Sequence, residues 1–206
     1  MPSFDQDVHA FWDSRTETLA KIKSRSLGAD ALTLTALNVL IYAQLEGGIK
    51  ELTSLTIREV NSLQVPLGRV APCLLAWRNA PEIDRLRKAI TFDNVTHHAP
   101  LSTELARTIV IRDLSVSSEF NQMNPRSLVK IYSGFHLDQT DLKKTLGRIE
   151  TLVSARNEAA HNGVLPPLAL SLLEQQTRGY VATVEVILTD VSLQLLTLFS
   201  KGLHLR

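Results

Sequence analysis

Hydrophobic residues recur at helical spacing along most of the chain. Within residues 4–25 the apolar positions lie three, four or seven apart and are separated by charged residues, which is typical of an amphipathic helix. The positions that form this stripe are Phe4, Val8, Phe11, Trp12, Leu19 and Ile22. Residues 26–28, Ser-Leu-Gly, end the pattern, and Asp30 is a good N-cap for the helix that follows.

The second predicted helix runs from about residue 31 to 62 and is apolar almost all round. A helix without a polar face is buried on most sides, so we expect it to be central. Gly47 and Gly48 lie inside it, and each glycine costs a helix about 1 kcal/mol relative to alanine. The pair therefore predicts either a kink or the close approach of another helix.

Residues 64–123 have no sustained periodicity and form a predicted irregular insertion. Pro66, Gly68, Pro72 and Pro81 interrupt this stretch. We expect a short helix at 82–90, a polar loop at 91–100 and a helix at 101–114. The β-branched run at 108–111 suits a strand equally well.

Helical patterns return in the last third of the chain. Asn124 and Pro125 resemble a cap and first residue, predicting a short helix to about 133. Thr140 is the expected cap of a long helix that reaches His161, and the last helix is expected at 168–200. We therefore predict a single all-α domain over residues 1–206, an up-and-down helical bundle of four or five long helices with the insertion at 64–123.

Composition agrees with that fold and narrows the function. The chain has 206 residues, of which 44% are hydrophobic but only 5% aromatic, so aliphatic side chains must fill the core. The net charge of +1 excludes a globally basic nucleic-acid-binding surface.

One cysteine, Cys73, cannot form an internal disulfide, and the acidic N-terminus is unlike a signal peptide, so a cytoplasmic location is expected. Glu185, Asp190 and Gln194 interrupt the apolar run at 181–199, so no membrane association is expected.

The most chemically specific segment is Arg156-Asn157-Glu158-Ala159-Ala160-His161. Asn157 and His161 lie about 40° apart around a helix, whereas Arg156 and His161 lie about 140° and 7.5 Å apart. One helix alone therefore does not direct the arginine and the histidine at one atom, but two such helices facing each other across a two-fold axis would bring them together. The competing interpretation is a solvated helix end with no catalytic role.

The Arg-x4-His spacing, followed by a helix stop, resembles the HEPN superfamily (higher eukaryotes and prokaryotes nucleotide-binding). LNVLIYAQLEGGIKELTSLTIREVN at 37–61 resembles the second helix of standalone bacterial members. NPRSLVKIYSGFHLD at 124–138 resembles the RiboL-PSP type and related members. The resemblance covers about 30–62 and 124–200, and Asn162, between His161 and Gly163, departs from the usual Ala-His-Gly.

This resemblance implies a metal-independent endoribonuclease, often a toxin or defence effector, that acts as a homodimer with a composite site. Its substrate would be RNA, and an antitoxin or defence-system protein is a possible partner. Arg156 would bind the scissile phosphate, Asn157 would orient it, and His161 would transfer the proton. Glu46, an acid within a very apolar helix, is a further candidate, or else a structural partner of Arg156 or of donors at a helix end.

No cofactor or metal is expected, because His97-His98 has no carboxylate or cysteine at ligand spacing. The alternative function is a non-catalytic HEPN-like module that binds a partner protein or a nucleotide.

Overall fold

The computed structural model describes residues 3–71, 74, 122–162, 169–202 and 204, with the exception of the side chains of Leu67 and Asn162. The described residues form five α-helices and one 3-10 turn and contain no β-strand. The all-α prediction is therefore confirmed. The helices are α1 (Phe4–Arg25), α2 (Ala31–Ser62), α6 (Pro125–Gly134), α7 (Thr140–Asn162) and α8 (Leu170–Ser200), and the turn is Leu67–Arg69.

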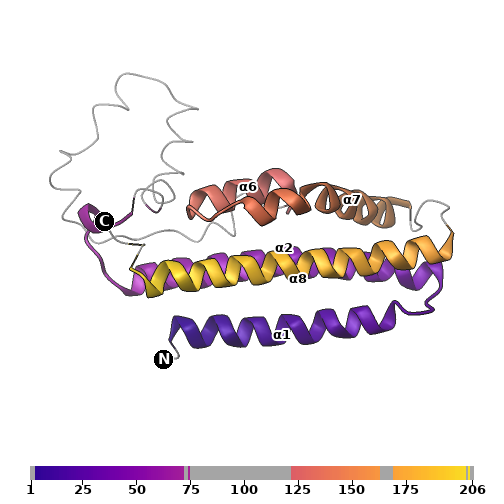
Figure 1. Ribbon diagram of the computed structural model, residues 1–206, viewed down its shortest axis with the longest axis horizontal. Coiled ribbons are helices and arrows are strands. Elements are labelled where there is room, and N and C mark those ends of the chain that lie inside the picture. The colour runs from indigo at the N-terminus through magenta and orange to yellow at the C-terminus, as the bar shows by residue number, and fades with distance from the viewer. Residues whose placement is uncertain (1–2, 72–73, 75–121, 163–168, 203, 205–206) are drawn as a thin grey trace, which may run out of the picture.

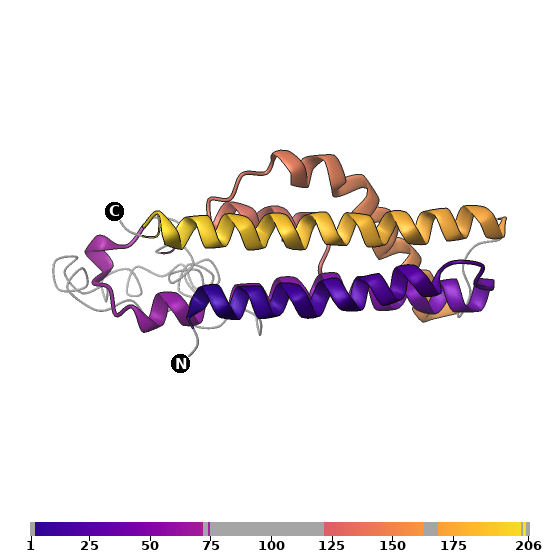
Figure 2. The ribbon, with the colours of Figure 1, turned by 60° about the horizontal axis from the view of Figure 1, so that its bottom comes forward.

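Helices α2 and α8 lie side by side in the centre of the bundle, with α1 on one side of them and α6 and α7 on the other (Figure 1, Figure 2). Contacts set the directions of the helices. Phe4 at the start of α1 contacts Phe199 at the end of α8, with ring centroids 4.5 Å apart and the rings tilted by 52°. Arg58 near the end of α2 reaches Asp7, with an N–O distance of 3.0 Å. Helix α1 is thus antiparallel to both central helices, and the chain runs up and down.

The core lies along the two central helices and consists mainly of aliphatic side chains. Ile41, Leu45, Ile49 and Leu52 recur at helical spacing on α2 and are fully buried. On α1 the predicted stripe is buried except for Trp12, which is 38% exposed. Its indole N–H donates to Thr189 Oγ1 at 3.1 Å, so Trp12 links α1 to α8 at the edge of the core.

By length and composition alone, α2 and α8 are each apolar enough to cross a membrane, with mean hydropathies of 1.2 and 1.6 over the most apolar stretch. Half of each stretch is buried inside the bundle. Central helices are covered by protein on most sides and therefore meet the same criterion. The expected absence of membrane association stays a prediction.

The two adjacent glycines of α2 have different surroundings. A Cβ on Gly48 would lie 2.8 Å from Leu188 Cδ2, closer than carbon atoms pack without movement. A Cβ on Gly47 would lie 3.7 Å from the Arg15 guanidinium, an ordinary contact distance. The expected close helix approach is therefore confirmed, and it occurs at Gly48, where α8 packs against α2.

Most helix starts agree with the caps read from the sequence. Asp30 Oδ1 accepts a hydrogen bond from Thr33 N at 2.7 Å, and Asn124 Oδ1 accepts one from Ser127 N at 3.0 Å. The start of α7 differs, because Thr140 is already helical. Asp138 Oδ1 accepts hydrogen bonds from both Thr140 N (3.1 Å) and Thr140 Oγ1 (2.8 Å). The aspartate therefore supplies the capping acceptor that was expected from the threonine.

Only the ends of the 64–123 insertion belong to the described residues. The 3-10 turn at Leu67–Arg69 follows α2, and Met123 lies just before Asn124, the cap of α6. The predictions for 82–90, 91–100 and 101–114, together with Cys73, His97 and His98, lie outside the described residues.

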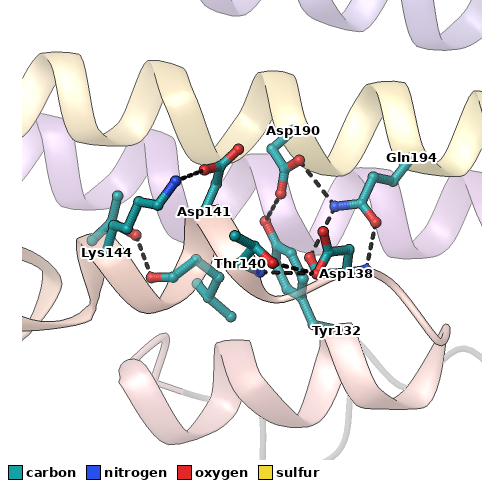
Figure 3. A network of polar contacts seen from close by, with 9 residues as sticks. Tyr132, Asp138, Thr140, Asp141, Lys144, Asp190 and Gln194 are labelled. Carbon is teal, nitrogen blue, oxygen red and sulfur yellow. Dashed lines mark hydrogen bonds and ion pairs between the residues drawn. The ribbon is translucent and has the colours of Figure 1, made fainter.

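Polar residues on α8 that interrupt its apolar sequence form a network with α6 and the α6–α7 loop (Figure 3). Tyr132 donates from its hydroxyl to Asp190 at 2.7 Å, and Gln194 Nε2 donates to Asp190 at 2.9 Å. Gln194 also bonds the backbone of Asp138 on both sides, accepting from its N–H (2.6 Å) and donating to its C=O (3.0 Å). Burial, and secondly the Asp190 carboxylate, raise the pKa of Tyr132. The network attaches α6 and the start of α7 to the central helix.

Candidate functional site

Arg156 is half-buried on the side of α7 that packs onto α2. It lies four and seven residues after the buried Leu152 and Ile149, so helix geometry places it on the same side as these core residues. Its guanidinium carbon stands over the ring of Tyr42 on α2, 5.1 Å from the ring centroid. This is a cation–π contact between two helices.

Asn157 is the immediate neighbour of Arg156 and is also half-buried. Arg156 Nη1 donates to Asn157 Oδ1 at 3.0 Å. The amide thus holds one end of the guanidinium while the tyrosine ring lies under it. The structure brings these two predicted site residues together.

Tyr42 is buried, with 4% of its surface exposed. Its hydroxyl oxygen accepts a hydrogen bond from the backbone N–H of Met123 at 2.9 Å. Burial, and secondly the Glu46 carboxylate one turn along α2, raise the pKa of Tyr42 to about 12, although the Arg156 cation and the Met123 N–H act in the opposite direction. The phenol is therefore neutral at physiological pH.

Glu46 is half-buried on the same side of α2 as Tyr42. Its Oε1 forms an ion pair with Lys50 Nζ at 2.5 Å, four residues along the same helix. The sequence left open a pairing of Glu46 with Arg156, but the structure gives Glu46 a lysine partner instead. Among the described residues no carboxylate forms an ion pair with Arg156.

His161 lies one turn beyond Asn157, near the end of α7, and is exposed. Within the described part of the chain its imidazole has no hydrogen-bond or ion-pair partner. Arg156 is thus held against α2 while His161 is directed to solvent. The two residues do not meet in a single chain.

A separate pocket of about 470 Å³ lies between α1 and α2. Its cations are both compensated, since Arg15 pairs with Glu51 at 2.6 Å and Arg58 with Asp7 at 3.0 Å. Arg15 also donates to Gln44 at 2.7 Å. These contacts hold α1 on α2, and they make the pocket a poor site for an anion.

Sequence reasoning did not assign roles to Tyr42, Lys50 or Met123. The signal for Tyr42 and Lys50 was available, because each lies four residues from Glu46 and therefore on its side of the helix. No local signal pointed to Met123, which lies 81 residues from Tyr42 in the chain.

Among the described residues no group of three or more His, Cys, Asp or Glu side chains is arranged to hold a metal ion. Comparison with known families finds a match over residues 14–205 to the family described as MAE_28990-like HEPN. The chain belongs to the HEPN superfamily. The match includes the whole of the Arg156–His161 segment and nearly all of the bundle, so HEPN membership is a property of the entire fold.

No curated protein and no solved structure matches the chain. HEPN membership indicates a nuclease-like or nucleotide-binding function in general terms. The finer assignment depends on the chemistry of Arg156 and the two residues that hold it, Tyr42 and Asn157, which together are the Arg156 cluster.

Proposed function

We propose that this HEPN protein is a metal-independent endoribonuclease in which Arg156 binds the scissile phosphate. The observation that carries the proposal is the state of the arginine: half-buried, held by Tyr42 and Asn157, and without a carboxylate partner among the described residues. A guanidinium in a partly desolvated position attracts phosphate more strongly than one in water, and its planar fork matches two phosphate oxygens.

His161 is the proposed proton-transfer group. The 2′-OH of RNA attacks the adjacent phosphorus, its proton passes to a base, and the 5′-oxygen leaves with a proton from an acid. The products are a 2′,3′-cyclic phosphate and a 5′-hydroxyl end, so no water or oxidant is consumed. An imidazole titrates near neutral pH and is suited to either step. Asn157 orients the phosphate. The negative charge of the Glu46 carboxylate acts on the electrostatic environment of Tyr42 and Arg156.

A second copy of the chain would complete the proposed site. Within one chain Arg156 is directed to α2 and His161 to solvent. A two-fold dimer in which the α7 helices face each other would place the arginine of one copy near the histidine of the other. A toxin or defence role, a cytoplasmic location and an antitoxin or defence-system partner follow from the resemblance to standalone members and are part of the proposal.

One observation favours a second candidate, a binding module that takes up a nucleotide or a partner protein without cleaving it. His161 has no residue to orient it in the described part of the chain, and a catalytic histidine is usually held by a hydrogen bond. Binding through the Arg156 cluster would need no such orientation.

The deciding experiment is incubation with single-stranded RNA in EDTA, followed by analysis of the product ends. We expect cyclic phosphate and 5′-hydroxyl ends, no cleavage of DNA, and complete loss of activity in His161→Ala. Arg156→Ala should lower kcat/KM by about a hundredfold or more, as removal of a transition-state donor does. His9→Ala and Arg25→Ala, which change exposed residues on α1, are the matched controls.

Folding is checked alongside by thermal unfolding. His161→Ala should stay within about 0.5 kcal/mol of the wild type because the side chain is exposed. Arg156→Ala should lose about 0.5–1 kcal/mol with the cation–π contact. Cleavage that survives both substitutions, or that requires a divalent ion, would favour the binding module.

A further inference from the structure

Tyr42 contacts three separate parts of the protein. Its ring lies under the Arg156 guanidinium of α7, and its hydroxyl oxygen accepts the Met123 N–H at the start of the α6 region. On its own helix, the Glu46 carboxylate one turn away influences the same hydroxyl.

The ring of Tyr42 has little freedom to move. It is buried among core residues, and the bond from Met123 holds the phenol oxygen at the far end. Met123 is itself fully buried, and the residue after it, Asn124, caps α6. A ring held at both ends is a rigid platform, whereas an arginine side chain loses rotamer entropy when it is placed.

We propose that Tyr42 is the positioning residue that holds Arg156 in its phosphate-binding geometry. This inference rests on the proposed function, since the phosphate would belong to the RNA substrate. The tyrosine acts through the arginine and makes no contact with substrate. Because the phenol carries no charge, it fixes the guanidinium without neutralising it, as a carboxylate in the same place would.

The competing interpretation is that Tyr42 only fills the core. In that case its replacement changes stability but leaves the environment of the Arg156 guanidinium unaltered. The two interpretations therefore differ in what happens at Arg156.

The test compares Tyr42→Leu, which removes the ring, with Tyr42→Phe, which keeps the ring and removes the hydroxyl. Tyr180→Leu is the matched control, since Tyr180 is a similarly buried tyrosine, on α8. The first readout is the NMR resonance of the Arg156 Nε–Hε group, assigned from its loss in Arg156→Lys. A proton over an aromatic face is shifted upfield, so Tyr42→Leu should move the signal downfield, while Tyr42→Phe and Tyr180→Leu should leave it near its original position.

The second readout is RNA cleavage. We expect kcat/KM to fall by about two- to fivefold in Tyr42→Leu, the factor corresponding to one exposed to half-buried cation–π contact, with recovery in Tyr42→Phe. An unmoved Arg156 resonance in folded Tyr42→Leu overturns the inference whatever the activity. A moved resonance with unchanged kcat/KM also overturns it.

Failure of the proposed function gives a different pattern. If the wild type cleaves no RNA, titration with inorganic phosphate is followed at Arg156 Nε–Hε. A response in the wild type that weakens in Tyr42→Leu supports the positioning role, and no response in the wild type overturns it. If Tyr42→Leu does not fold, Tyr42→Met, which supplies a flexible apolar side chain without a ring, takes its place in every comparison.

Discussion

At the scale of single residues, the central feature is a half-buried arginine, Arg156, at the contact between α7 and α2. The Arg156 guanidinium contacts an aromatic face and an amide oxygen, both of which stabilise a cation without carrying a full negative charge. Glu46, the acid one turn from Tyr42 on α2, forms an ion pair with Lys50. Within the described part of the chain, Arg156 therefore has no carboxylate partner.

A prediction at this scale concerns pH. The pKa of Tyr42 is raised to about 12 and that of Tyr132 is also raised, in both cases mainly by burial. For a group whose pKa is higher in the folded state, the stability is complete below the unfolded pKa, near 10, and is lost as pH rises through the folded value. We expect the ionisation of each tyrosine in the unfolded chain to lower the free energy of unfolding by about 1 kcal/mol by pH 11.

Urea unfolding at pH 9 and pH 11 measures this loss. In Tyr42→Phe and in Tyr132→Phe the decrease between the two pH values should be smaller than in the wild type, because one ionising group is absent from the unfolded chain. An equal decrease in all three proteins would contradict the assignment of the alkaline loss to these two tyrosines.

At the scale of elements, the bundle depends on the contact between its two central helices. A test of this contact uses two neighbouring glycines of α2, Gly47 and Gly48, which have different surroundings. Gly47→Ala should stabilise the protein by up to about 1 kcal/mol, since the helix gains propensity and the new Cβ meets only Arg15 at 3.7 Å. Gly48→Ala places its Cβ 2.8 Å from buried Leu188. This overpacking costs about 1–3 kcal/mol, and the gain in helix propensity offsets only part of the cost, so the variant should be less stable than the wild type.

Thermal and denaturant unfolding of the two variants give the comparison directly. Gly147→Ala on α7, where a Cβ would meet nothing within 4 Å, supplies the control for helix propensity alone. Equal stabilisation in all three variants would show that α8 can move away from α2 at no cost.

At the scale of the whole molecule, the separation of Arg156 and His161 leads to a prediction about assembly. If a site takes its arginine from one copy and its histidine from the other, a mixed dimer of Arg156→Ala and His161→Ala contains one intact site. Co-refolding the two inactive variants in equal amounts should then restore about a quarter of the wild-type RNA cleavage, since half of the dimers are mixed and each has one of two sites.

Size-exclusion chromatography with light scattering reports the oligomeric state in the same samples. Each variant refolded alone serves as the control and should stay inactive. A monomeric protein, or a mixture without recovered cleavage, would contradict a site shared in this way.

Much of the fold could be predicted because its signals are local. The stripe of α1, the Asp30 and Asn124 caps and the Gly28 stop each depend on residues within a few positions of one another. Local hydrogen bonds and periodicity act over the same few residues, so they can be read before the fold is known. Thr140 shows the limit, since Asp138 two residues earlier competed for the same role.

The sequence by itself determined the order and approximate bounds of the helices within the described residues, and the presence of an Arg-x4-His segment at the end of α7. Only the tertiary structure decided what surrounds that segment. Tyr42 and Arg156 lie on helices separated by the whole insertion, Met123 binds the Tyr42 hydroxyl from 81 residues away, and Gly48 meets Leu188 on the last helix. The physical reason is that such contacts depend on the rotation and depth at which packed helices meet, which side-chain interdigitation over the entire core sets.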